Sequence, residues 1–281
     1  MRILIAGASG VVGKRVVQRL HDDGHTVTGL SRRPEQAATI EAAGAHALVA
    51  DVYDTDSLRS AFDTAKPEVV IHQLTDLSGG DRTANAKIRT VGTRNLVDAA
   101  RHAGVGRIVA QSIAWAYAPG DSPAGEDTPL DLGGAPDRLA TVAGVAALED
   151  AVRDLPEWVV LRYGMLYGPD TWYYPGGLMA QMAQSRSLPA TADVVSFLHV
   201  DDAAAAAVAA LAWPSGPVNV CDDDPAPGYD WVPSFCEHVG APRPERVAQD
   251  RAGWARGADN AYARSQLGWA PQRPTWRYGD A

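Results

Sequence analysis

A glycine-rich turn near the start of the chain limits what it can fold into more than any other feature. Gly7, Gly10 and Gly13 directly follow a short apolar run, Arg2–Ala6, and open a segment whose apolar residues recur at helical spacing. In a strand–turn–helix unit the first glycine permits a tight turn, the second lets the backbone approach a pyrophosphate, and the third lets helix and strand pack closely. The helix N-terminus adds free N–H groups and a positive dipole. The turn therefore predicts a dinucleotide site formed by Gly7, Ser9, Gly10, Val11, Val12 and Gly13.

Apolar runs and helical patterns alternate through the first half of the chain. Strands are predicted at 2–6, 26–30, 47–50, 69–72, 107–111 and 158–163, with helical segments between them. Strands separated by helices of this length pair in parallel through right-handed crossovers, and a sheet covered on both faces has nearly all-apolar strands. We predict an α/β fold with a doubly wound Rossmann parallel sheet over residues 1–163. A smaller α/β C-terminal lobe, residues 164–281, would be interwoven with it and bind the substrate.

Composition and charge exclude several classes of partner. The formal net charge of -9 disfavours nucleic acid and anionic membranes. The apolar stretch over residues 203–213 is about half the length of a membrane span. Two cysteines, Cys221 and Cys236, form no C-x-x-C pattern, and the seven histidines show no metal-ligand spacing. We therefore expect a cytoplasmic protein without a metal, a monomer or homodimer, whose partner is a small-molecule substrate rather than nucleic acid or membrane.

The end of the second predicted strand favours NADP(H) as the cofactor. NAD-binding domains carry an acidic residue here that accepts hydrogen bonds from the ribose, whereas this chain has Ser31, Arg32 and Arg33. Guanidinium groups bind phosphate through paired hydrogen bonds, which suits a 2′-phosphate; a solvated basic loop is the alternative. The ends of the next two strands are predicted to flank the adenine and the nicotinamide side. These residues are Asp51, Val52, Gln73 and Leu74.

Further motifs are spread over nearly the whole chain. They are Asp51-Val52, residues 92–96 (GTRNL), Ser112, residues 161–169 (LRYGMLYGP), residues 199–202 (HVDD) and residues 267–271 (LGWAP). Together with the glycine turn they resemble the extended short-chain dehydrogenase/reductase family, which includes nucleotide-sugar epimerases and dehydratases. The resemblance implies that Tyr163 and Met165, in the segment 161–169, contact the cofactor.

The catalytic pair that the resemblance implies is missing. Redox members of that family use a serine or threonine, a tyrosine, and a lysine four residues after the tyrosine. The resemblance places the pair on the helix predicted over residues 138–152, near Thr141 and Val145, and this helix has neither residue type. The three lysines of the chain, Lys14, Lys66 and Lys87, are preceded at that distance by Gly10, Phe62 and Thr83. No Y-x-x-x-K therefore exists in the sequence, and we interpret the chain as an atypical member.

Residues at and near Ser112 are the candidates to replace the missing pair, because Ser112 follows the fifth strand at the ligand-binding edge of such a sheet. We predict that Ser112 polarises a substrate oxygen and that Tyr117 donates the proton, since a phenol can act as a general acid. A packing role is the equal alternative for Tyr117. A cluster of aromatic residues suits an apolar or planar substrate. The predicted substrate-binding residues are Trp115, Tyr167, Trp172, Tyr173, Tyr174 and His199.

These features predict an enzyme, an NADP-dependent oxidoreductase of atypical short-chain type. It would reduce a carbonyl or an activated double bond in a small, partly apolar molecule. Two alternatives remain open: a non-redox isomerase, cyclase or dehydratase on the same scaffold, and an NADP-binding redox sensor without catalysis.

Overall fold

The chain forms two compact units whose segments alternate along the sequence. The computed structural model describes residues 1–77 and 82–277. Unit 1 consists of Met1–Ser112, Gly134–Leu161 and Ala204–Pro217, and unit 2 of Ile113–Gly133, Arg162–Ala203 and Val218–Ala281. The prediction that residues 1–163 bind a dinucleotide and residues 164–281 a substrate is not tested by this division.

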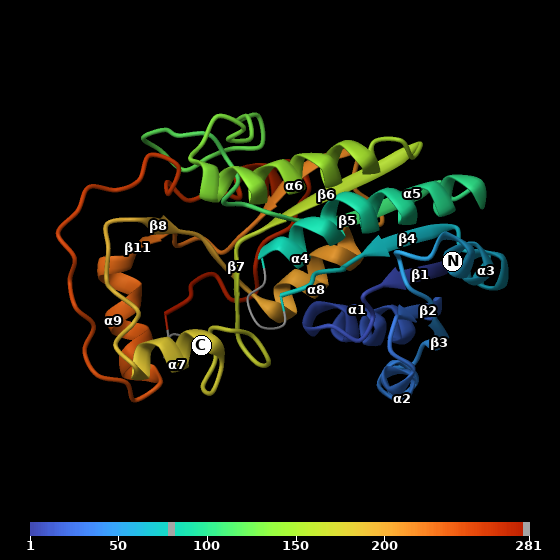
Figure 1. The fold of residues 1–281 in the computed structure, drawn as a ribbon, viewed down its shortest axis with the longest axis horizontal. Coiled ribbons are helices and arrows are strands. Elements are labelled where there is room, and N and C mark those ends of the chain that lie inside the picture. Colours follow the sequence, from blue (N-terminus) through green and yellow to red (C-terminus); the bar gives the residue numbers. More distant parts are fainter. Residues whose placement is uncertain (78–81, 278–281) are drawn as a thin grey trace. The chain divides into compact units, whose positions relative to one another are not determined.

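A seven-stranded sheet is the centre of the fold (Figure 1). Its strand order is β10-β6-β5-β4-β1-β2-β3, and β1 pairs in parallel with both β2 and β4. The chain reverses direction of winding between β1 and β4, which is the switch point of a doubly wound sheet. The predicted α/β fold is confirmed. The strands are β1 Arg2–Ala6, β2 Thr26–Ser31, β3 His46–Val49, β4 Val69–His72, β5 Arg107–Ile113, β6 Glu157–Tyr163 and β10 Gly216–Val220.

Helices cover both faces of the sheet of unit 1. Figure 1 shows α1 on the opposite side from α5 and α6. Buried aliphatic residues of α3, α5 and α6 pack against β1, β4 and β5. The valines and leucine of α1 form its buried face, as their helical spacing predicts. The helices are α1 Val11–Asp22, α2 Ala37–Ala42, α3 Thr55–Ala65, α4 Arg82–Lys87, α5 Thr93–His102, α6 Pro136–Val152 and α8 Val200–Ala209, with a 3-10 turn at Pro34–Gln36.

A π-helical turn, Ile88–Gly92, lies between α4 and α5, in the helical segment that follows the fourth strand. A π turn shifts the register of the residues that follow it, and such turns are frequent at functional sites. Its buried residues include Arg89, whose charge lies inside unit 1.

Unit 2 contains two small sheets and an aromatic core. β7 (Met165–Tyr167) pairs in parallel with β9 (Phe197–His199), and β8 (Val194–Val195) pairs antiparallel with β11 (Ala226–Pro227). Its helices are α7 Leu178–Gln184, α9 Gly228–His238 and α10 Ala261–Gln266. The core rings meet edge to face or tilted, with centroids 5.4 to 6.4 Å apart around Phe197, Trp231 and Phe235. Such contacts add to the stability gained by burying these rings.

Candidate functional site

Two glycines of the predicted turn are required by the packing of unit 1. Gly7 has a φ of 90°, and a Cβ there would lie 2.7 Å from the backbone oxygen of Gln73. A Cβ on Gly13 would lie only 2.0 Å from the backbone oxygen of Gly7. Both distances are far below a van der Waals contact. Glycine at these positions is what allows β1, the first turn of α1 and the segment after β4 to approach one another.

Gly10 has a different environment. A Cβ there would meet one atom, the Gly7 oxygen at 3.2 Å, and the residue is exposed. Gly10 precedes α1 in an extended conformation and offers no side-chain cap to the helix. The first-turn N–H groups of α1 are thus left for another acceptor, as at a phosphate-binding helix N-terminus. The turn fits the pyrophosphate of a dinucleotide.

The predicted 2′-phosphate residues lie on the surface at the end of β2. The Ser31 hydroxyl accepts a hydrogen bond from the Arg33 backbone N–H at 3.1 Å, which closes a tight turn. Arg33 is exposed, and Arg32 is half-exposed with its guanidinium 3.4 Å from the Asp76 carboxylate. The Arg32 side chain is half-exposed, whereas that of Asp76 is only 18% exposed. The guanidinium is therefore open to a phosphate from the solvent side.

Asp51 and Val52 are engaged by their own neighbours. The Asp51 carboxylate accepts from the Tyr53 backbone N–H at 2.9 Å, and the Val52 carbonyl accepts from the Asn95 side chain at 2.8 Å. These bonds hold the segment after β3 in place and leave its role at the adenine a prediction.

His72, the last residue of β4, fixes the position of Gln73 and Leu74. Its Nδ1 accepts from the Leu74 backbone N–H at 3.2 Å, so Nε2 carries the proton and donates to Thr93 Oγ1 at 2.8 Å. Complete burial, together with the charge of Arg89, lowers the pKa of His72 to about 4. The Gln73 backbone N–H donates to the Ala6 carbonyl at 2.8 Å. The neutral imidazole therefore holds this segment against the glycine turn.

Ser112 lies in a buried polar cluster of unit 1. Its hydroxyl donates to Glu149 Oε1 at 2.7 Å, and its side chain is 1% exposed. Glu149 on α6 also acts on Arg89: burial lowers the pKa of Arg89 to about 10, and the Glu149 charge opposes that shift. The Ser112 proton is thus directed at a carboxylate rather than at a ligand. This geometry favours a positioning role for Ser112 over polarisation of a substrate oxygen.

Tyr117 lies in the interior of unit 2. The residue is 1% exposed, its hydroxyl donates to Asn219 Oδ1 at 2.5 Å, and it accepts from Arg162 Nη1 at 2.9 Å. Burial raises the pKa of Tyr117 above its ordinary value, although the Arg162 charge lowers it. A proton donor must reach the substrate, so this burial favours the packing role that the sequence left as the alternative.

Most of the other predicted aromatic residues pack within unit 2 or lie on its surface. The Tyr163 hydroxyl donates to the Ala203 carbonyl at 3.1 Å, and that of Tyr167 to the Thr275 carbonyl at 2.9 Å. His199 Nδ1 accepts from the Asp201 backbone N–H, and its ring meets Tyr167 edge to face with centroids 5.0 Å apart. Tyr173 belongs to the aromatic core, whereas Trp172 and Tyr174 are exposed.

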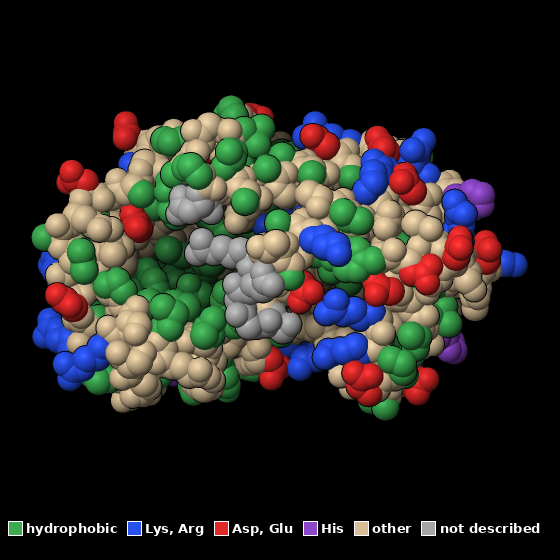
Figure 2. Space-filling view, viewed as in Figure 1, with side chains coloured by type: hydrophobic (Ala, Val, Ile, Leu, Met, Phe, Trp, Pro, Cys, Tyr) green, Lys and Arg blue, Asp and Glu red, His purple; other side chains and the backbone are tan. Residues whose placement is uncertain are grey.

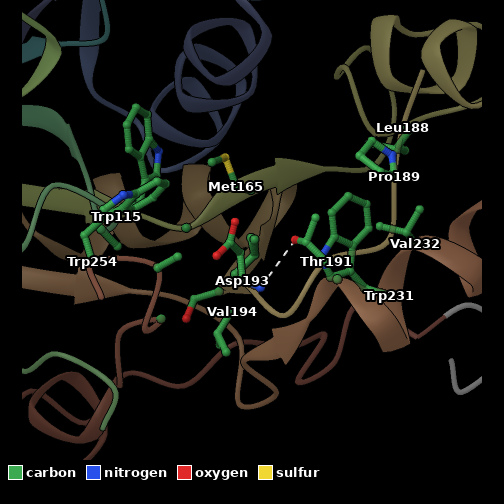
Figure 3. Close-up of a pocket in the computed structure, with 17 residues that line it drawn as sticks. Trp115, Met165, Leu188, Pro189, Thr191, Asp193, Val194, Trp231, Val232 and Trp254 are labelled. Atoms are coloured by element: carbon green, nitrogen blue, oxygen red, sulfur yellow. Dashed lines mark hydrogen bonds between the residues drawn. The ribbon is translucent and has the colours of Figure 1, made fainter. Parts of the chain in front are cut away.

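A cavity of about 280 Å³ lies within unit 2, and two of the predicted site residues, Trp115 and Met165, line it. Figure 2 shows a hollow with hydrophobic side chains in the part of the molecule that holds β7, β8 and α9. The lining residues that the sequence did not predict include Thr191, Asp193, Trp231 and Trp254 (Figure 3). The signal available was the unusual tryptophan content of the chain after residue 214.

The lining of this cavity is apolar with one charged group. Among the described residues that line it, Asp193 is the only ionisable one, and none is basic. In the described part of the chain no three histidine, cysteine or acidic side chains are grouped as metal ligands would be. Within residues 1–77 and 82–277, no helix combines the length and the apolar character needed to cross a bilayer.

Comparison with known proteins decides the family. A family model described as the NAD dependent epimerase/dehydratase family matches residues 3–221. This chain belongs to that family. The resemblance inferred from the motifs is confirmed, and the family covers the glycine turn, Ser112 and the HVDD segment.

Relatives in the epimerase/dehydratase family include both reductases and epimerases. A Streptomyces protein named 3-diazoavenalumate denitrifying reductase is 44% identical, and the alignment covers 99% of each chain. A UDP-glucose 4-epimerase of Mycolicibacterium smegmatis is 30% identical over 97% of this chain and 94% of its own. The crystal structure of Bordetella bronchiseptica WbmG, solved with NAD and UDP, superposes with a TM-score of 0.77 at 24% identity, covering 97% and 90% of the two chains. These matches support an oxidoreductase of epimerase/dehydratase type.

A buried carboxyl in unit 2 predicts how stability depends on pH. Asp222 is 1% exposed, and its Oδ2 has no hydrogen-bond partner among the described residues. Burial raises the pKa of Asp222 to about 8. Between roughly pH 4 and 8 the folded protein keeps this proton and the unfolded chain has lost it, so the free energy of unfolding should fall by about 1.4 kcal/mol per pH unit as pH rises.

The Asp222→Asn variant should abolish this slope. Its amide keeps the oxygen that accepts from the Asp224 backbone N–H and cannot ionise. Urea unfolding at pH 5, 7 and 9 should show a variant more stable than the parent at pH 9. Asp63→Asn, in which an exposed carboxylate is neutralised, serves as the control. Parallel pH profiles of Asp222→Asn and the parent would contradict the assignment.

Proposed function

We propose that the protein is an NADPH-dependent reductase that replaces the diazo group of a planar aromatic molecule with hydrogen. The proposal is supported by the 44% identity, over 99% of both chains, to the 3-diazoavenalumate denitrifying reductase. The observation that carries it is chemical. The sequence has no Y-x-x-x-K, and Tyr117, the best substitute donor, is buried and bonded to Asn219 and Arg162.

Reduction without a proton donor suits a diazonium carbon. Reduction of a carbonyl leaves an alkoxide oxygen that a general acid must protonate. Reduction of an aryl diazonium forms one C–H bond from the hydride, and the C–N bond breaks with its electron pair leaving on N2. An aryl diazonium cation and NADPH thus give arene, N2 and NADP⁺, and no proton is consumed. The absence of the tyrosine–lysine pair is therefore consistent with this reaction, which needs no general acid.

Residues of unit 1 provide the cofactor site in this proposal. The turn from Gly7 to Gly13 would hold the pyrophosphate, and Ser31, Arg32 and Arg33 the 2′-phosphate. Asp51 and Val52 would flank the adenine, and Gln73 and Leu74 the nicotinamide side. The bound cofactor supplies the hydride. WbmG was solved with NAD, so the preference for NADP rests on the two arginines and on the lack of an acidic residue at the end of β2.

The cavity of unit 2 would hold the aromatic part of the substrate. Trp115, Trp231 and Trp254 offer flat apolar surfaces for a ring system. A nucleoside diphosphate sugar is less suited to this cavity, because no basic residue lines it among those described. The lining therefore favours the reductase over an epimerase that acts on UDP-sugars.

A turnover assay tests the proposal. Benzenediazonium and benzaldehyde are offered with NADPH or NADH, and we measure loss of nicotinamide absorbance, N2 release and, with 4-deuterated NADPH, deuterium in the arene. We expect diazonium reduction with NADPH, above the rate of heat-inactivated protein, and no benzaldehyde reduction. Arg33→Ala should raise KM for NADPH about tenfold and leave NADH unchanged. Arg59→Ala, an exposed arginine of α3, is the control.

Three results would contradict this function. Benzaldehyde turnover without diazonium turnover would restore the carbonyl hypothesis. Turnover of an added substrate with no net change in NADPH would favour an isomerase or dehydratase. Tight NADPH binding with no turnover of either probe would favour a redox sensor.

A further inference from the structure

Trp231, a residue that lines the cavity of unit 2, has a buried indole N–H with no acceptor among the described residues. The residue is 7% exposed. Buried indole N–H groups usually find an acceptor, because an unpaired donor loses its bonds to water without compensation. This donor therefore marks the place where a ligand atom that accepts a hydrogen bond would be stabilised.

The backbone holds Trp231 beside two other polar residues of the cavity. Trp231 lies in the first turn of α9, which directly follows β11. The backbone N–H of Gly228 donates to the Asp193 carbonyl at 2.9 Å, and that of Tyr229 donates to the Thr191 carbonyl at 2.8 Å. In Figure 3 the nitrogen edge of the Trp231 ring faces Thr191. The donor and the polar side chains of 191–193 thus share one end of the cavity.

Asp193 provides an acceptor at the same place. Its Oδ1 accepts from the Ala252 backbone N–H at 2.9 Å, and no donor among the described residues is bonded to Oδ2. Figure 3 shows the carboxylate between Trp231 on one side and the pair Trp115 and Trp254 on the other. Since no basic residue lines the cavity, the carboxylate repels an anionic ligand group.

One ligand group satisfies both residues. An anion would accept from Trp231 but is repelled by Asp193, and a cation would suit Asp193 but cannot accept from the indole N–H. A neutral hydroxyl accepts one hydrogen bond and donates another. We propose that this cavity recognises a hydroxyl group on an aromatic ring, which accepts from Trp231 Nε1 and donates to Asp193. The substrate of the proposed reductase is then a phenol; this step rests on the proposed function only in that unit 2 binds the substrate.

The test compares the binding of three 2-substituted naphthalenes to the protein in the absence of cofactor. 2-Naphthol, 2-methoxynaphthalene and 2-naphthoate are titrated into the full-length protein by calorimetry. We expect 2-naphthol to bind at least about tenfold more tightly than the other two, since the methoxy group cannot donate and the carboxylate is repelled. Equal affinities for the three probes in the parent protein would overturn the proposal.

Matched variants assign the preference to the two side chains. Trp231→Phe keeps an aromatic ring and loses the N–H, and Asp193→Asn keeps the oxygen that accepts from Ala252. Each should reduce the ratio of 2-naphthol to 2-methoxynaphthalene affinity about fivefold, and Asp193→Asn should also improve 2-naphthoate binding. Trp158→Phe, which makes the same indole-to-phenyl change at a half-buried residue of β6 in unit 1, should leave the ratio unchanged. Melting temperatures of all variants identify any that are unfolded.

The two proposals fail separately. Selective 2-naphthol binding that depends on Trp231 and Asp193, without diazonium turnover, would support the recognition site and refute the proposed reaction. Diazonium turnover by a protein whose 2-naphthol preference survives Trp231→Phe and Asp193→Asn would support the reaction and refute the recognition site.

Discussion

The Gly13→Ala variant is expected to lose at least about 4 kcal/mol of stability, or to fail to fold. A Cβ at this position would lie 2.0 Å from the backbone oxygen of Gly7 and 2.9 Å from its carbonyl carbon. Neither neighbour is the end of a flexible side chain, so α1 and β1 must separate. In a chain of this size such a loss lowers the melting temperature by roughly 10 °C. Calorimetry, followed by NADPH titration of any folded protein, measures both consequences.

A second glycine provides the control for Gly13→Ala. Gly106 is exposed, and a Cβ there would have no neighbour within 4 Å. Gly106→Ala should change the free energy of unfolding by no more than about 0.5 kcal/mol. A melting temperature of Gly13→Ala within about 2 °C of that of Gly106→Ala would correspond to a stability difference of roughly 0.5–1 kcal/mol. Together with full NADPH affinity, that result would show that the close approach of helix and strand is not needed.

The Glu149→Gln variant is expected to lose about 3 kcal/mol of stability. The amide oxygen of the substituted side chain would still accept from Ser112, but Arg89 would remain buried without the carboxylate whose charge opposes its desolvation. The cost comes from an uncompensated buried cation, which is larger than the loss of one hydrogen bond. Urea unfolding at pH 7 measures the change.

A double variant distinguishes this mechanism from a packing defect. When Arg89→Met is combined with Glu149→Gln, both charges are gone and much of the lost stability should return. Asp56→Asn removes an exposed partner of Arg59 and should cost less than about 1 kcal/mol. The stability lost by the double variant is compared with the losses of Glu149→Gln and Arg89→Met measured separately. If it equalled the sum of those two losses, the charge interaction between Arg89 and Glu149 would not be the cause.

The fold was predictable because its signals are local. The spacing of Gly7, Gly10 and Gly13 after an apolar strand reports a backbone geometry that only glycine permits, and the structure shows that geometry at Gly7 and Gly13. The alternation of apolar runs with helical patterns likewise follows from burial of both faces of a parallel sheet. The π-helical turn at Ile88–Gly92 was not predictable in this way, because its one-residue shift leaves no periodic signal over so short a segment.

The candidate site was predictable only in part. Sequence position brought Ser112 and Tyr117 forward as catalytic residues, yet their partners are Glu149, 37 residues away, and Asn219, 102 residues away. Of the predicted aromatic residues only Trp115 lines the cavity, and Met165, predicted at the cofactor, lines it too. Which aromatic side chains turn into a core and which line a cavity depends on contacts between distant segments.

By itself the sequence determined that a glycine-rich turn opens a doubly wound α/β chain, that two arginines follow its second strand, and that no Y-x-x-x-K pair is present. These are properties of residue type and short spacing, and folding cannot alter them. The tertiary structure decided that Ser112 faces a buried carboxylate, that Tyr117 is enclosed, and that Trp231 and Asp193 share a cavity. Each of these depends on the pairing of segments far apart in the chain, where burial and hydrogen bonding rather than local pattern decide what a side chain can do.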